Sequence, residues 1–161
     1  MPRRTLLRKL TLATLTLSLT LTNLIAQNAY PLNFDDTTLK TAINDISNWN
    51  GKIVACDVEV LQVEKGYQDK SYYKVKLEKG SQMWVGDLFN NGFEKPGSKL
   101  RILGYFAKVE SDDKLKKFNK NSYHILTIGV VDLATKQMAA LPAAERQVKE
   151  WSNGEIPKGK K

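Results

Sequence analysis

The sequence contains one cysteine and one histidine, and each scarcity excludes a class of site. Cys56 has no second cysteine with which to form an internal disulfide. His124 and Cys56 are too few for a metal site, which needs several ligands at defined spacing. A Cys-His nucleophilic pair would also need an orienting group and an accessible thiol. Because Cys56 alternates in step with Val54 and Val58, we predict instead that it is a buried core residue.

Motifs typical of enzymes are missing as well. The chain has no G-x-S-x-G nucleophile turn, no phosphate-binding loop and no H-E-x-x-H metal motif. We therefore predict that the protein is not an enzyme and that it carries no catalytic residue, no cofactor and no metal.

Acidic residues are missing from the N-terminal segment, where the first one is Asp35. The segment starts with four basic residues (Arg3, Arg4, Arg8 and Lys9) and continues, over residues 10–26, with a run dominated by Leu and Thr. This order is typical of a secretory signal. The run is too short and too rich in threonine to span a membrane. We expect residues 1–29 to be a signal peptide, cut at Ala26 or Ala29, and the mature protein to be periplasmic or secreted without a transmembrane anchor.

Three other interpretations of this segment stay open. The alternation of Leu and Thr also fits a β-strand. A basic, threonine-rich and acid-free leader also resembles an organellar transit peptide. Arg3 and Arg4, followed by 5–7 (TLL), loosely resemble a twin-arginine signal. The leucines favour secretion over a transit peptide.

The net charge changes when the chain is divided in this way. The whole chain has 25 Lys and Arg against 17 Asp and Glu, a formal charge of +8. Without the four basic leader residues, 21 remain against 17, or +4. Lys158, Lys160 and Lys161 supply three more, so the body is near +1. The basic isoelectric point therefore says little about nucleic-acid binding by the folded body. We divide the chain into a leader (1–29), one domain (30–157) and a basic tail (158–161).

Periodicity predicts a mainly β domain flanked by two helices. Apolar residues at helical spacing predict helices over 35–48, with Asp35 or Asp36 as cap, and over 141–152. The expected core contacts of these helices come from Ile43, Ile46, Val148 and Trp151. Alternation of period two predicts five strands, at 53–63, 71–78, 82–85, 99–109 and 123–133. The first two strands form a hairpin in which Glu59 lies opposite Lys76. Gly104 and Gly129 are expected at bulges or sharp bends.

This strand order resembles an OB-fold, a five-stranded Greek-key barrel. The resemblance is carried by 51–54 (GKIV), 72–77 (YYKVKL) and 95–104 (KPGSKLRILG), and it covers about residues 52–133. The last of these segments is similar to the turn into the fourth strand of nucleic-acid-binding OB domains. Small exported bacterial OB-fold proteins are the family most similar in kind. One departure is that residues 86–98 are expected to be a loop, where many OB-folds have a helix.

The resemblance implies a binding surface on the outer face of the second and third strands, flanked by the loops after the first and fourth. In this chain the surface comprises Tyr67, Tyr72, Lys74, Lys76, Trp84, Lys114, Lys116, Lys117 and Phe118, with Lys120 in the same last loop. Rings interleaved with ammonium groups suit single-stranded nucleic acid, because bases stack on rings and phosphates meet the positive charges.

A simpler explanation of the same residues is a solvated surface without a ligand. Glu59 matches Lys76 in charge, and Glu110, Asp112 and Asp113 leave the last loop near +1. Among functions, we place first a non-enzymatic module that binds single-stranded nucleic acid or another anionic polymer. A protein-interaction or envelope-adaptor domain, using the same face or a free strand edge, is the alternative. Oligosaccharide binding is a third hypothesis.

Overall fold

The computed structural model describes residues 31–152 and 158–159 of the 161-residue chain. The predicted leader and its cleavage site lie outside the described residues, as do residues 153–157 and 160–161. The elements are β1 (Leu32–Asn33), α2 (Asp36–Asn44), α3 (Ile46–Trp49), β2 (Ile53–Lys65), η1 (Tyr67–Asp69), β3 (Ser71–Lys76), β4 (Gln82–Asp87), β5 (Lys99–Lys108), η2 (Lys114–Lys117), β6 (Tyr123–Asp132), β7 (Met138–Ala140), η3 (Pro142–Ala144) and α4 (Glu145–Ser152).

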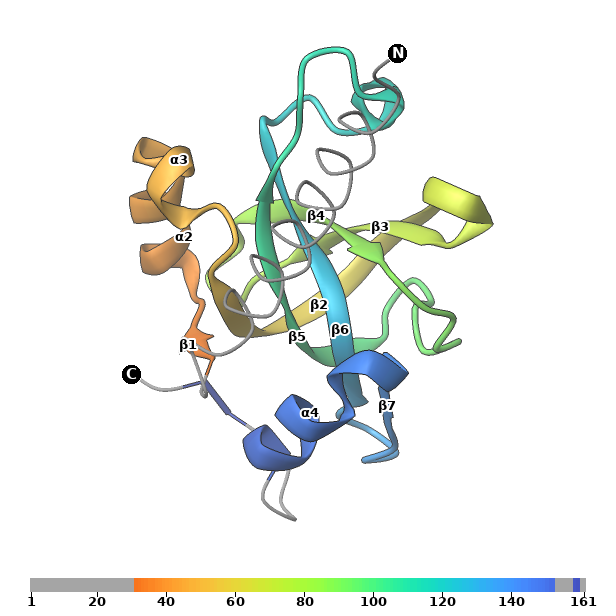
Figure 1. The fold of residues 1–161 in the computed structure, drawn as a ribbon. Coiled ribbons are helices and arrows are strands. Elements are labelled where there is room, and N and C mark those ends of the chain that lie inside the picture. The colour runs from red at the N-terminus through yellow and green to blue at the C-terminus, as the bar shows by residue number, and fades with distance from the viewer. Residues whose placement is uncertain (1–30, 153–157, 160–161) are drawn as a thin grey trace, which may run out of the picture.

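Five of the strands close into a barrel. Their order is β2-β3-β4-β6-β5, and β5 returns to pair with β2. All pairs are antiparallel except β4 with β6. A closed five-stranded barrel with this crossover is an OB-like Greek-key barrel, so the predicted fold class is confirmed (Figure 1). The short strand β1 adds to β2 in parallel, and β7 adds to β6; neither was predicted.

The hairpin register is as predicted. Glu59 pairs with Lys76, and Lys76 Nζ lies 3.1 Å from a carboxylate oxygen of Glu59. Beyond Val60 the register shifts by one residue, because Leu61 has no partner in β3. This bulge bends the long strand β2, which the barrel needs to close.

The Glu59–Lys76 pair should contribute little to stability. Both side chains are exposed enough for water to screen the charges. In a double-mutant cycle with Glu59→Gln and Lys76→Met, we expect a coupling free energy of about 0.2–1 kcal/mol from urea unfolding. A coupling several times larger would mean that the pair is desolvated, contrary to its exposure.

Gly104 and Gly129 flank a bulge, as predicted. Leu103 pairs with Gly129 and Gly104 pairs with Thr127, so that Ile128 of β6 is left without a partner. A Cβ on Gly104 would lie 2.6 Å from the carbonyl oxygen of Leu126. Glycine is thus required by the close approach of the two backbones.

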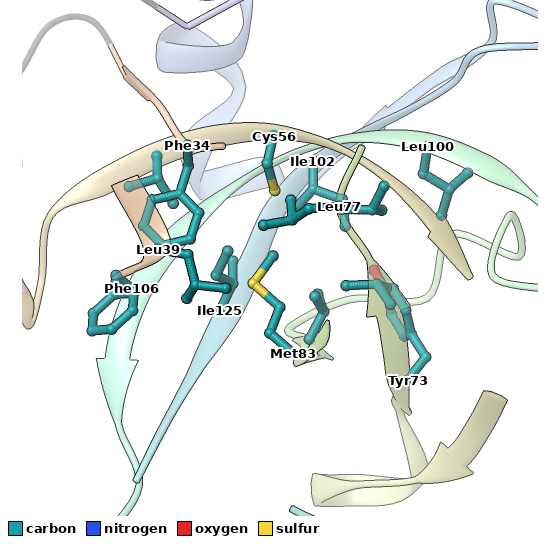
Figure 2. Packing of buried hydrophobic residues seen from close by; sticks show 14 of the residues in the cluster. Phe34, Leu39, Cys56, Tyr73, Leu77, Met83, Leu100, Ile102, Phe106 and Ile125 are labelled. Atoms are coloured by element: carbon teal, nitrogen blue, oxygen red, sulfur yellow. The ribbon is translucent and has the colours of Figure 1, made fainter. Parts of the chain in front are cut away.

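The barrel interior is filled by one apolar cluster, drawn in Figure 2. The residues that alternate inward on β2 belong to it, and Cys56 is 3% exposed. Burial, followed by the charge of Asp57, raises the pKa of the Cys56 thiol well above its usual range. The predicted core cysteine is therefore confirmed, and its thiol stays protonated and inert.

The N-terminal helix differs from the prediction because it is broken in two. Asp35 caps α2 by accepting from the backbone N–H groups of Thr37 and Thr38, as expected. Asp45 interrupts the helix with a non-helical backbone conformation, and its carboxylate caps α3. The expected core contact of Ile43 is wrong: its side chain is 40% exposed. Leu39 and Ala42 are buried in the core instead.

The C-terminal helix covers the barrel from outside. The predicted core contacts of Val148 and Trp151 are confirmed. Together with Leu141 and Ala144, these residues pack on the outer side of β2, β5 and β6. Figure 1 shows α4 on a different side of the barrel from α2 and α3. Within the described ranges 31–152 and 158–159, no helix is long and apolar enough to cross a membrane.

The third barrel strand is longer than predicted. Gly86 and Asp87, expected in the following loop, belong to β4 and are buried because they pair with β6. Residues 88–98 contain no helix, as expected from the sequence.

Candidate binding surface

The outer face of β3 and β4 carries the residues expected to bind a ligand. Tyr72, Lys74 and Lys76 alternate with the inward Tyr73 and Val75, and Lys74 pairs across the sheet with Trp84. Tyr72 and Trp84 lie outside the barrel core, in a small separate cluster. The two loops expected to flank this face are residues 66–70, between β2 and β3, and residues 109–122, which we call the β5–β6 loop.

Three of the predicted side chains form a stack of rings. The Tyr72 and Trp84 rings have centroids 5.0 Å apart at 12°, and Phe118 continues from Trp84 at 6.0 Å and 29°. We call these three residues the ladder. Tyr72 is 1% exposed and Trp84 is 6% exposed, whereas Phe118 is only partly buried. The two strand aromatics therefore stack against the protein's own loop and leave no free ring face for a base.

The β5–β6 loop is held on this face by two buried side chains. Leu115 packs against the ladder and is 1% exposed. Asn119 is fully buried, and its side-chain amide donates to the Tyr72 hydroxyl at 2.8 Å and to the carbonyl of Tyr123 at 2.9 Å. Detachment of the loop would break the hydrogen bonds of Asn119 and expose the Leu115 side chain to water, and both changes cost free energy. The loop is therefore a stable part of the fold that covers this face.

The two flanking loops are joined to each other. The Tyr67 hydroxyl donates to the Asp113 carboxylate, and this carboxylate also accepts from the backbone N–H of Leu115. Partial burial of Tyr67, followed by the hydrogen bond and charge of Asp113, raises the Tyr67 pKa to about 12. The phenol is thus a proton donor over the physiological range, and it ties loop 66–70 to the β5–β6 loop.

His124 belongs to the same buried network and carries no charge. Its Nδ1 lies 3.3 Å from the Tyr72 hydroxyl, and its ring meets the Tyr72 ring edge to face. Burial lowers its pKa to about 4. This is the environment of a structural core histidine.

The lysines of the β5–β6 loop divide into two groups. Lys114 Nζ lies 4.8 Å from the centroid of the Tyr67 ring, and Lys117 Nζ lies 4.5 Å from that of Phe118. Lys116 donates to the carbonyl of Asn121, and Lys120 donates to the carbonyl of Lys116. The first pair therefore rests on ring faces near solvent, whereas the second pair closes the loop on itself.

Ring contacts thus involve six of the nine predicted residues: Tyr67 with Lys114, and Tyr72, Trp84, Phe118 and Lys117. Lys74 lies beside Trp84 on β3, and Lys116 belongs to the β5–β6 loop. Lys76 lies toward the other end of the strand, in its ion pair with Glu59. Sequence reasoning missed Leu115, Asn119 and the tie made by Asp113. The sequence contains one signal for the burial of Leu115. It is a single apolar residue among charged neighbours, which indicates that its side chain packs against the protein.

A second polar cluster lies at the end of β4. Asp87 accepts from the Tyr73 hydroxyl at 3.0 Å and from the side-chain amide of Asn91 at 2.8 Å. Glu94 accepts from the Ser71 hydroxyl at 2.6 Å. Burial, followed by the charge of Glu94, raises the Asp87 pKa to about 7. These contacts hold loop 88–98 on the barrel.

Metal ligation has no support in the part of the chain that the structure describes. No group of three or more His, Cys, Asp and Glu side chains there could hold a metal ion. A cavity of about 310 Å³ beside the start of α2 is lined by both apolar and charged residues, and several of the charged ones already have partners. Asp36 accepts from the backbone of Lys79 and Ser81, and Arg101 pairs with Asp57.

Comparison with known proteins gives little beyond the fold. No family model matches the chain, and no curated protein matches it. One similar solved structure is a chain from "Structure and Conformational Change of a Replication Protein A Heterotrimer Bound to ssDNA". The identity is 11% and the TM-score 0.36; the match covers 61% of this chain and 64% of that one, less than two thirds of its length. At these values, the OB-like assignment rests on the strand order and not on the similarity.

Proposed function

We propose that the protein is a non-enzymatic OB-fold module that binds single-stranded nucleic acid or another anionic polymer. The binding surface is the end of β3 where loop 66–70 meets the β5–β6 loop. The observation that carries the proposal is the set of ammonium groups held over rings there, at Tyr67 and Phe118.

The charge of this surface is more positive than the composition of the loop suggests. Glu110 pairs with Lys108, which lies outside the loop, at 3.2 Å. The carboxylates of the loop that remain to be counted are those of Asp112 and Asp113. The four lysines of the loop outnumber these two carboxylates, and Lys74 on the adjacent strand has no described ion pair. A local excess of ammonium groups favours an anionic ligand.

The aromatic rings of Tyr67 and Phe118 favour nucleic acid over an anionic polymer that has no aromatic groups. Single-stranded nucleic acid offers a phosphate and a flat base at each step, which matches a ring beside an ammonium group. A protein adaptor would need an apolar patch or a free strand edge. This face instead presents partly buried rings under lysines.

Binding should weaken steeply with salt. With about three phosphates contacted, a single strand releases enough counterions to lower the affinity about 20-fold between 50 and 200 mM salt. Fluorescence anisotropy of a labelled dT oligomer would measure this, and a combined Lys114→Gln and Lys117→Gln variant should flatten the salt dependence. If the oligomer does not bind at low salt, the proposal is wrong. If the protein instead copurifies with a protein partner, and its affinity for that partner does not change with salt, an adaptor function is favoured.

The proposed place of action is outside the cytoplasm. The support is the leader-like composition of residues 1–29, which lie outside the described structure. Expression in a bacterium followed by mass measurement of the product would test it. A shortened chain in the periplasm or medium is expected, and a full-length chain confined to the cytosol would contradict it.

A further inference from the structure

The ladder has one end that a ligand can reach. Its inner members, Tyr72 and Trp84, are covered by the β5–β6 loop, and its outer member is Phe118. The Lys117 ammonium group lies over the Phe118 ring, 4.5 Å from the ring centroid. The outer ring of the ladder therefore carries an ammonium group, and a flat ring stacked on Phe118 would compete with this group for the ring.

The loop 66–70 provides a second ring with the same arrangement. Tyr67 is 38% exposed, and the Lys114 ammonium group lies 4.8 Å from its centroid. The hydrogen bond from Tyr67 to Asp113 fixes this pair relative to the β5–β6 loop. Two rings capped by ammonium groups are therefore held at one joined pair of loops.

We propose, on the basis of the proposed function, that Phe118 and Tyr67 are the base-stacking positions, and that Tyr72 and Trp84 are not. When a strand binds, a base takes the place of each ammonium group over its ring, and the ammonium group of Lys117 or Lys114 turns to a neighbouring phosphate. The ligand class is single-stranded nucleic acid with its bases unstacked.

The exchange is favourable on physical grounds. An ammonium group over a ring at an exposed site is held less strongly than a base stacked on the same ring. The displaced ammonium group is not left unpaired, because it gains a phosphate oxygen. The buried part of the ladder contributes by holding the Phe118 ring at a fixed angle, which lowers the ordering cost of stacking.

A comparison of two ligands of equal charge tests this. The first is a dT oligomer, and the second is an abasic oligomer with the same number of phosphates. We expect the protein to bind the dT oligomer at least about tenfold more tightly, since stacking contributes at that scale for each base. Phe118→Leu, which keeps an apolar contact to Trp84, should lose about tenfold for dT and leave abasic binding unchanged. Tyr105→Leu, on the α4 side of the barrel, is the matched control and should change neither.

The outcomes separate the two proposals. If neither oligomer binds, the proposed function itself fails. If both bind equally and Phe118→Leu changes nothing, nucleic-acid binding stands and the stacking positions are overturned. If Phe118→Leu weakens both ligands equally, Phe118 has only a structural role, which also overturns the inference.

A measurement without substitution covers the case of a variant that does not fold. Ring-proton resonances of Phe118, followed with labelled phenylalanine, should shift to lower frequency on addition of the dT oligomer. The abasic oligomer should produce no such shift. Equal shifts with both ligands would contradict stacking on this ring.

Discussion

Replacement of Trp84 by alanine is expected to destabilise the protein by about 3–5 kcal/mol. An exposed stacking residue would cost far less when truncated, usually within about 0.5 kcal/mol. Trp84 lies between Tyr72 and Phe118 in the ladder and is 6% exposed, so its removal leaves a cavity beneath the β5–β6 loop. Urea unfolding followed by circular dichroism gives the free energy of unfolding directly.

The control for this variant is Trp84→Phe, which keeps a flat ring between the same two neighbours. We expect it to recover most of the lost free energy, because the ring–ring contacts and most of the buried volume remain. Should Trp84→Ala unfold at the same urea concentration as the unsubstituted protein, the loop would not cover this face in solution. Tyr72 and Trp84 would then regain the ligand-stacking role predicted from the sequence.

The second large effect is a loss of stability as the pH rises from about 4 to about 7. Asp87 is buried beside the negative charge of Glu94, and its pKa is raised from 3.8 to about 7. Between these values, the folded chain holds a proton that the unfolded chain has lost. The resulting stabilisation is fully present below about pH 3.8, and it is lost as the pH rises through about 7. A difference of about 3 pKa units, at about 1.36 kcal/mol each, corresponds to about 4 kcal/mol.

Asp87→Asn should remove most of this pH dependence. The substituted side chain stays neutral and still offers an oxygen to the Tyr73 hydroxyl. At pH 8.5 the variant is therefore expected to be more stable than the unsubstituted protein, and at pH 4.5 it should have no such advantage. Asp112→Asn, at an exposed carboxylate of the β5–β6 loop, serves as the control and should leave the profile as it is. Identical profiles for the Asp87 variant and the unsubstituted protein would show that Asp87 ionises normally in the fold.

The barrel itself could be predicted from the sequence because its signals are local. Alternation along each strand assigns inner and outer faces, and one charge match, Glu59 with Lys76, sets the hairpin register. The bulge between β5 and β6 could also be predicted, because a glycine inside a strand pattern, here Gly104 and Gly129, is a local signal. The break at Asp45 was harder to see, since the apolar spacing continues through it from Ala42 to Ile46. Only the backbone geometry shows that the chain turns there.

The sequence predicted which residues lie on the outer face of β3 and β4, but not how far each of them is buried. The period-two alternation correctly predicted that Tyr72 and Lys74 lie on the outer face. It contains no information on whether a loop covers that face. The cover depends on contacts between residues far apart in the chain, such as Asn119 with Tyr72 and Asp113 with Tyr67. A loop with seven charged side chains among residues 110–120 gives no periodic signal for such packing. The role of the nine residues in ligand binding stays a prediction from the sequence, which binding experiments test.

Both covers of the barrel follow β3 and β4 in the chain, so they are synthesised after these strands. The outer face of β3 and β4 is covered by residues 109–122, and the outer side of β2, β5 and β6 is covered by α4. A growing chain that ends before residue 109 would carry uncovered aromatic side chains on β3 and β4. It would also lack the β6 strand that β4 requires on its other side. We therefore expect early stop codons to give an aggregation-prone or degraded product instead of a smaller working domain.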